Sequence, residues 1–288
     1  MSALAAAPDA PSPPGSVTTA ASPPPLEDGW QATTPPGDTL TRQYVDNHAA
    51  YLETVAGAGG GRFTRTPWYA AADLGRPATV LNAALLLHPD SLRDPTPTMA
   101  MLSELDAFYS GGVGTVYLWS PWPTPDLRRY GWQLEGHPPL MLRPPGGRLP
   151  GASDVRVERV ADAAGVRRWE RVVVEGYPFP DVQPWLPGAF LDPHILDDDR
   201  MRLWLAFDRG EPVTAGGLFV DCGIAHFSFG VTLPLARRRG HWYALVRERL
   251  LSAPDLPAAG LFADDSRPGA ERVGFLPVSR FTLWSRTR

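Results

Sequence analysis

The order of apolar and amphipathic segments in the second half of the sequence constrains the fold more than any other feature. Residues 155–160 alternate as a strand, and residues 162–177 follow with helical spacing. Three strand-like segments fill residues 201–233, and residues 239–253 again have helical spacing. A strand, a short helix and a last strand occupy residues 258–284. Strands that alternate with helices are typical of an α/β protein, and the run of consecutive strands adds antiparallel pairs, so we predict a mixed sheet (α+β).

The first half begins its ordered part with a predicted helix. Asp38 or Thr39 is the expected N-cap, and the glycines from Gly57 onward end the helix. Its apolar face carries Leu40, Tyr44, His48, Tyr51 and Leu52. Further along we predict a buried strand over Ala78–Leu87, a helix over residues 97–112, a strand over residues 113–120, and a short helix with a strand over residues 124–144.

An internal repeat indicates that the two halves are related. Residues 125–142 and 269–284 share a short helix with arginines, a stop at glycine next to an aromatic residue, a turn and a strand. We therefore predict two similar domains, over residues 39–145 and 152–288, joined by a linker rich in proline and glycine. Residues 1–38 are rich in Pro, Ala, Ser and Thr and are expected to be a disordered tail.

Bulk composition excludes several classes of protein. The chain has 288 residues, of which 43% are hydrophobic, and a net charge of −4, which disfavours binding to nucleic acid or to anionic lipid. It has a single cysteine, Cys222, which we interpret as a small buried residue, and this fits a reducing compartment. The N-terminal residues lack a basic segment followed by an apolar run, and no apolar run is long enough to span a bilayer. We expect a cytoplasmic protein.

The junction at Val231–Gly240 is the segment most suggestive of function. A strand leads through a proline and three consecutive arginines to Gly240, where a helix begins. Free N–H groups at a helix start bind anions, and arginine adds bidentate contacts to phosphate. The alternative interpretation is that the arginines are solvated surface residues.

The segment GVTLPLARRRGHWYALVRERL resembles the acyl-CoA-binding segment of the GNAT acetyltransferase superfamily. In that family a strand and a proline precede the pattern Gln/Arg-x-x-Gly-x-Gly/Ala, and Arg237 and Gly240 fall in register with it. The later segment ERVGFLPVSRFTLW and the opening segment VRVERVADAAGVRRWERVVVEG are similar to the last helix and strand and to the first strand and helix of the same family. The resemblance covers residues 150–288. The first half also resembles this fold, although more weakly, so the resemblance implies a tandem GNAT-like fold.

This resemblance implies N-acetyl transfer from acetyl-CoA, as co-substrate, to an amine of a small molecule or a protein. By position, Val231 and Leu233 correspond to the strand that pairs with the pantetheine arm. The pyrophosphate would be held by the turn that carries Arg237, Arg238, Arg239 and Gly240.

Three residues are candidates for catalysis. His226 is the candidate base, because it lies on the strand before the motif and an imidazole titrates near neutral pH. Glu175 lies at the end of an early helix, where the family lines its acceptor site. Tyr243 is a candidate proton donor to the leaving thiolate. The structural alternatives are a satisfied strand histidine for His226 and a surface carboxylate for Glu175.

Two positions depart from the family pattern. Trp242 stands where the family has glycine or alanine, so its indole either fills the pyrophosphate space or points into the helix core. Ala270 stands where many members have a tyrosine that protonates the thiolate. The alternative to an acetyltransferase is therefore a catalytically inactive GNAT-like module for binding or regulation.

Other patterns are assigned to structure rather than chemistry. The acidic stretch around His194 is expected to be solvated surface and not a metal site, so we predict no metal. The glycines at Gly111, Gly112 and Gly114 precede a strand, whereas a dinucleotide fingerprint follows one. The expected partners are acetyl-CoA and the amine, with neither nucleic acid nor membrane, and the protein is expected to be a monomer or a homodimer.

Overall fold

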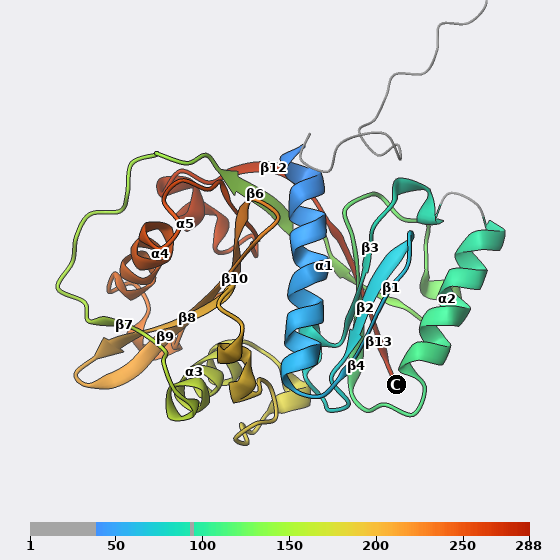
Figure 1. Cartoon of the computed structure of the whole chain (residues 1–288), viewed down its shortest axis with the longest axis horizontal. Coiled ribbons are helices and arrows are strands. Elements are labelled where there is room, and N and C mark those ends of the chain that lie inside the picture. The colour runs from blue at the N-terminus through green and yellow to red at the C-terminus, as the bar shows by residue number, and fades with distance from the viewer. Residues whose placement is uncertain (1–38, 93–94) are drawn as a thin grey trace, which may run out of the picture.

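The computed structural model describes residues 39–92 and 95–288 and contains two mixed β-sheets with helices around them (Figure 1). The predicted tail over residues 1–38 lies outside the described residues. The helices are α1 (Leu40–Ala58), α2 (Pro95–Tyr109), α3 (Ala163–Gly176), α4 (His241–Leu251) and α5 (Arg267–Arg272), with short 3-10 turns between other elements.

The first sheet has six strands in the order β1-β2-β3-β4-β13-β5. These strands are β1 (Arg62–Arg65), β2 (Tyr69–Asp73), β3 (Ala83–Leu86), β4 (Thr115–Ser120), β13 (Thr282–Thr287) and β5 (Gln133–Gly136). The second sheet has seven strands in the order β7-β8-β9-β10-β11-β6-β12. They are β7 (Val157–Arg159), β8 (Met201–Asp208), β9 (Glu211–Asp221), β10 (Ile224–Thr232), β11 (Ala258–Leu261), β6 (Pro139–Arg143) and β12 (Leu276–Arg280).

The six strands of the first sheet match six strands of the second when the sheets are aligned on their parallel pairs, and β7 has no counterpart. In each sheet one parallel pair, β3–β4 or β10–β11, is linked by a crossover helix, α2 or α4. An inserted strand then follows, and it belongs to the other half of the chain in both cases. Thus β13 lies between β4 and β5, and β6 lies between β11 and β12.

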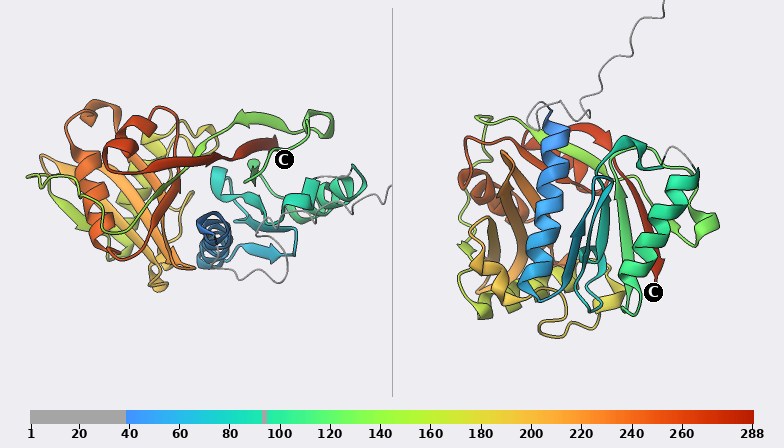
Figure 2. Two further views of the ribbon diagram at one scale, coloured as in Figure 1. Left: turned by 90° about the horizontal axis from the view of Figure 1, so that it is seen from above. Right: turned by 45° about the vertical axis from the view of Figure 1, so that its right-hand side comes forward.

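Each half therefore contributes its last strand to the sheet of the other half. Seen from above, the red C-terminal segment crosses from the second half to the first (Figure 2). Neither of the ranges 39–145 and 152–288 contains all the strands of its own sheet. The sequence pattern predicted one strand over residues 276–284, but the chain turns at the buried Phe281 and forms two strands in different sheets.

Helix α1 lies between the two sheets and contacts both of them (Figures 1 and 2). Its predicted start is confirmed, because the Thr39 hydroxyl accepts a hydrogen bond from the N–H of Arg42 at 3.1 Å. Tyr44, Leu52 and Val55 are almost fully buried in a core that also includes the inner face of the second sheet. This helix is consequently part of the interface that joins the halves.

Helices α1 and α4 cover opposite faces of the second sheet. His226 of β10 contacts Tyr44 of α1, whereas the ring centroid of its neighbour Phe227 lies 3.9 Å from the guanidinium carbon of Arg249 on α4. Successive side chains of a strand point to opposite faces, so these contacts place the helices on opposite faces. Helix α3, capped by Asp162 as predicted, packs on β8, β9 and β10.

Two local predictions are wrong. The strand expected over Ala78–Leu87 is shorter, because Thr79 has a φ of 45° and a 3-10 turn precedes β3. The side chain of Asn82 holds this turn by accepting from the N–H of Leu74 and donating to the carbonyl of Arg76. Cys222 is exposed rather than buried, since it lies at the tip of the β9–β10 hairpin.

Candidate functional site

The site begins where β10 separates from β11. Their parallel pairing covers only Ala225 with Ala258 and His226 with Ala259, although β10 continues to Thr232. Beyond that pairing the backbone of β10 bulges between Ser228 and Gly230. The separation leaves the second half of β10 unpaired on the side of β11.

Two side chains stabilise the bulge from opposite faces, the buried Arg249 and the partly buried Tyr177. Arg249 donates to the carbonyls of Gly217 and Ser228, the latter at 3.3 Å, where the bulge interrupts the ladder. The hydroxyl of Tyr177 accepts a hydrogen bond of 3.2 Å from the N–H of Gly230. Burial lowers the pKa of Arg249 to about 9, because the charged form loses its hydration. Backbone carbonyls and a tyrosine hydroxyl therefore make the contacts that stabilise the bulge, and no carboxylate of the described residues forms an ion pair with Arg249.

The turn after β10 leads to an open helix start at Gly240. Gly240 has a φ of 85°, a conformation that other residues rarely adopt, and no side chain caps the first turn of α4. Uncapped N–H groups and the positive end of the helix dipole favour an anion at this position. A Cβ at Gly240 would meet nothing within 4 Å, so the space beside this residue is open.

The three arginines of this turn point in different directions. Arg237 donates from Nε to the carbonyl of Thr232 at 3.0 Å, so it lies back along β10. Arg239 forms an ion pair of 2.9 Å with Asp208. Arg238 is exposed, and the described part of the chain provides it with no ion pair. Arg238 is thus the member of the group most available to a ligand.

The strand residues predicted to meet pantetheine are only partly available. Val231 is buried and lies so close to α3 that a Cβ on Gly176 would come within 2.5 Å of its Cγ2. Leu233 donates its N–H to the carbonyl of Val213 at 2.9 Å. Any ligand that follows this strand would therefore use the remaining backbone groups of β10.

Trp242 occupies the space between β10 and α5. Its indole nitrogen would lie 3.4 Å from a Cβ placed on Gly230 of β10. At the other end of the ring, Cζ3 would lie 3.5 Å from a Cβ on Gly269 of α5. The indole thus bridges the strand and the helix, and it packs with the core formed by α4 and α5.

The three candidate catalytic residues are not brought together. Glu175 pairs with Arg171 at 2.8 Å on the exposed side of α3. Tyr243 is on α4 and accepts from Arg272 at 3.1 Å, with its hydroxyl beside α5. His226 points to the opposite face of the sheet, toward α1. A single catalytic group built from all three is incompatible with this arrangement.

His226 lies in a buried group of rings between the two halves. Its Nε2 is 3.3 Å from the hydroxyl of Tyr44, and its ring centroid is 5.2 Å from those of His48 and Tyr51. Trp119 of β4 completes the group, 6.1 Å from His48. The Nδ1 atoms of both histidines are buried and have no hydrogen-bond partner among the described residues.

Burial keeps both imidazoles neutral. Desolvation holds the pKa of His226 well below its usual range, and the charged forms of His48 and Arg249 lower it further. The pKa of His48 falls to about 4 for the same first reason. The value near neutrality that was expected for His226 from its residue type is therefore wrong in this environment.

The structure resembles solved structures over most of its length. A GCN5-related N-acetyltransferase from Kribbella flavida superimposes with a TM-score of 0.58 and 18% identity, covering 83% of this chain and 95% of the other. A functionally unknown protein from Staphylococcus epidermidis gives 0.57 and 13%, covering 80% and 95%. A GCN5-related N-acetyltransferase-like protein from Streptococcus suis gives 0.52 and 13%, covering 87% and 100%. The fold is that of the GCN5-related N-acetyltransferases.

The predicted GNAT-like α/β fold is confirmed by this similarity. No family model matches the sequence, and no curated protein matches it. Structural similarity at identities this low establishes the GNAT fold alone. The chemistry therefore has to follow from the residues of the site.

The residues around the separation of β10 from β11 are only partly visible in the sequence. Tyr44 and His48 fall on one helical face, but their contact with β10 is a long-range feature. Arg249 stands among the apolar positions of its helix, and a charge in that pattern is the available signal. Tyr177 gives no signal, since a tyrosine after a helix is unremarkable.

The described residues contain no evident metal site. No group of three or more His, Cys, Asp or Glu side chains within them is arranged to hold a metal ion. None of the helices formed by these residues combines the length and apolarity needed to cross a membrane.

Proposed function

We propose that the protein is an N-acetyltransferase that transfers an acetyl group from acetyl-CoA to an amine of a small molecule or a protein. The proposal rests mainly on the strand separation between β10 and β11, which leads into the uncapped start of α4 at Gly240. The GNAT fold of both halves supports it. We also propose a cytoplasmic location.

The diphosphate of acetyl-CoA would bind at the first turn of α4. The amides that follow Gly240 and the positive end of the helix dipole favour its charge. Arg238 would add a direct contact, whereas Arg237 and Arg239 would shape the turn through their bonds to Thr232 and Asp208. The pantetheine arm would follow β10 past Val231 and Leu233.

The reaction would be direct attack of the neutral amine on the thioester carbonyl. A carbon–nitrogen bond forms, the carbon–sulfur bond then breaks, and the amine proton leaves to a base. His226 is the proposed base, because its buried Nδ1 has no other partner in the described chain and is neutral at pH 7. His226 and Tyr243 lie on opposite faces of the sheet, so they would act from opposite sides of the strand separation. Tyr243, on α4, would protonate the leaving thiolate in place of the tyrosine that Ala270 replaces.

Binding is tested by thermal stability in acetyl-CoA. Ligand at one hundred times its dissociation constant should add about 2.7 kcal/mol to the unfolding free energy. Gly240→Glu should abolish this gain, because a carboxylate beside the first-turn amides repels the diphosphate. Gly60→Glu is the matched control, since Gly60 has a similar φ of 67° and equally open surroundings. Retained affinity in Gly240→Glu would remove the site assignment.

The role of His226 is tested by the rate as a function of pH. Since its pKa lies well below 6.5, the rate should show no fall caused by this group between pH 8 and pH 6. His226→Ala should slow turnover and leave acetyl-CoA affinity unchanged. Unchanged turnover in that variant would exclude His226 as the base.

Trp242 favours a second candidate, a GNAT-like module that binds or regulates without catalysis. Its indole spans from Gly230 to Gly269, and it stands at the position where the family's glycine or alanine would leave space for the pyrophosphate. If the indole blocks the groove, the wild-type chain shows no stabilisation by millimolar acetyl-CoA, and Trp242→Gly gains it. Comparable stabilisation of both proteins would reject this candidate.

A further inference from the structure

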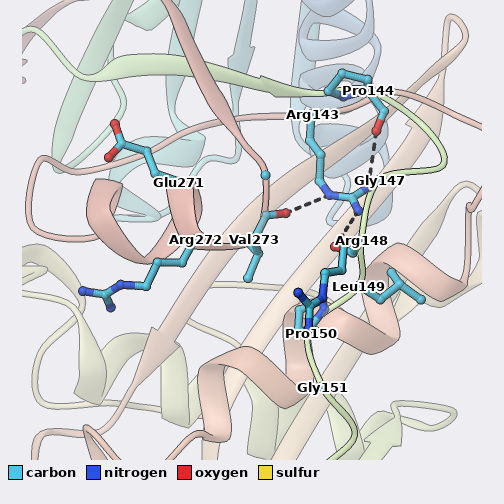
Figure 3. A pocket seen from close by; sticks show the side chains of 11 residues that line it. Arg143, Pro144, Gly147, Arg148, Leu149, Pro150, Gly151, Glu271, Arg272 and Val273 are labelled. Atoms are coloured by element: carbon cyan, nitrogen blue, oxygen red, sulfur yellow. Dashed lines mark hydrogen bonds between the residues drawn. The ribbon is translucent and has the colours of Figure 1, made fainter.

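A cavity of about 430 Å³ lies between the last turn of α5 and the segment that follows β6 (Figure 3). Its volume falls in the usual range for small-molecule sites, about 300–1,000 Å³. It shares no residue with the acetyl-CoA site proposed above, so a ligand here would be additional to that site. Its lining comprises Arg143, Pro144, the segment Gly147–Gly151 and the segment Glu271–Gly274.

Arg143 is the buried cation of this cavity. It is only 5% exposed, and its guanidinium donates to three carbonyls: Val273 at 2.8 Å, Arg148 at 3.2 Å and Pro144 at 3.3 Å (Figure 3). No carboxylate of the described residues lies within ion-pair distance of it. A guanidinium has five N–H donors, so these carbonyls leave donors available for a ligand.

The other charged groups of the lining leave this positive charge uncompensated. Arg148 is exposed and forms no ion pair with the residues that the structure describes. Glu271, the one acid in the lining, is held by Arg267 at 2.7 Å. Arg272 donates to the hydroxyl of Tyr243 and points away from Arg143 (Figure 3).

Two glycines let the backbone wrap closely around the guanidinium. A Cβ at Gly147 would lie 2.9 Å from Nη2 of Arg143, and one at Gly274 would lie 3.4 Å from its Nε. The guanidinium is therefore fixed in position by the chain on both sides. Buried and unpaired charges are costly, and a positioned guanidinium binds an anion with less loss of entropy than a mobile one.

We propose that this cavity binds the phosphate group of a small molecule, with Arg143 as the buried anchor and Arg148 as the second contact. A phosphate offers several oxygens to the planar donor pairs of two arginines, and its double charge compensates both of them. A single carboxylate would neutralise only one. The cavity is larger than a free phosphate ion, so the phosphate group of a larger molecule and inorganic phosphate are the two sources to distinguish.

Calorimetric titration of the full chain with ribose 5-phosphate, inorganic phosphate and ribose tests this site at constant ionic strength. Ribose 5-phosphate should bind saturably and ribose should not. Tighter binding of inorganic phosphate than of ribose 5-phosphate would identify the free ion as the ligand, in keeping with the proposal. The side-chain Nε–H resonance of Arg143 should shift during the same titration.

Variants locate the binding. Arg148→Ala should weaken ribose 5-phosphate at least tenfold, and Arg143→Lys should do the same if circular dichroism shows an intact fold. Arg129→Ala, which removes an exposed arginine of the first half, should leave the affinity unchanged. The proposal is overturned if neither phosphate binds, if Arg148→Ala binds normally, or if Gly240→Glu abolishes the binding.

Discussion

The histidine pair between α1 and β10 predicts a strong dependence of stability on pH. His48 is neutral in the folded protein, with a pKa of about 4, whereas the unfolded chain has the ordinary value of 6.5. As the pH falls below 6.5, His48 is protonated in the unfolded state, whereas in the folded state it stays neutral until about pH 4. Stability is therefore lost as the solution becomes more acidic.

The size of this effect follows from the shift. The difference between 6.5 and about 4 corresponds to about 3 kcal/mol once both states are protonated, and about 2 kcal/mol is already lost at pH 5. His226 adds to the loss in the same direction, because its pKa is also lowered. Other groups contribute a pH dependence that is common to the wild-type protein and its variants.

Substituting His48→Phe isolates this contribution. Phenylalanine keeps a ring against Tyr51 and Trp119 and cannot be protonated. Urea unfolding at pH 7 and pH 5 should show that the variant loses about 2 kcal/mol less than the wild-type protein. His194→Asn is a control of opposite sign, because Asp192 raises the pKa of the exposed His194 and this support exists only at low pH. Equal losses in His48→Phe and in the wild-type protein would refute the buried neutral pair.

Two further predictions concern the fold. Glu170→Ala should lower the unfolding free energy by about 3–5 kcal/mol, because the buried carboxylate accepts the N–H groups of Gly188, Phe190 and Leu191. The control Glu175→Ala should change the unfolding free energy by less than about 1 kcal/mol, because the ion pair of Glu175 with Arg171 is exposed. Equal effects of Glu170→Ala and Glu175→Ala in urea unfolding would contradict this prediction. The separate pieces 39–145 and 152–288 should fail to fold alone and should regain native circular dichroism when mixed, because each sheet needs a strand from the other piece. A cooperative transition in either isolated piece would show that the exchanged strands are dispensable.

The sequence predicted what depends on local interactions. The caps at Thr39 and Asp162, the helix starting after Gly240 and the order of strands all follow from side-chain hydrogen bonds, φ preferences and periodicity within a few residues. The uncapped helix start at Gly240 is a feature of this kind. Such features can be recognised in the sequence, because the residues that form them are neighbours along the chain.

The rest depended on contacts between distant segments. The pattern of residues 276–284 contains no information about which sheet each part joins, and the exchange of β6 and β13 was therefore missed. The same limit applies to His226, whose neighbours come from α1 and β4 of the other half. Its assumed pKa was wrong because burial is a property of the assembled core.

The most direct test of the proposed acetyltransferase is a crystal structure of the full chain with CoA. We predict the diphosphate within hydrogen-bonding distance of the amides that follow Gly240, with Arg238 beside it and the indole of Trp242 displaced from Gly230. A CoA molecule bound elsewhere, with the indole still between β10 and α5, would contradict the account and leave the GNAT fold without its proposed chemistry.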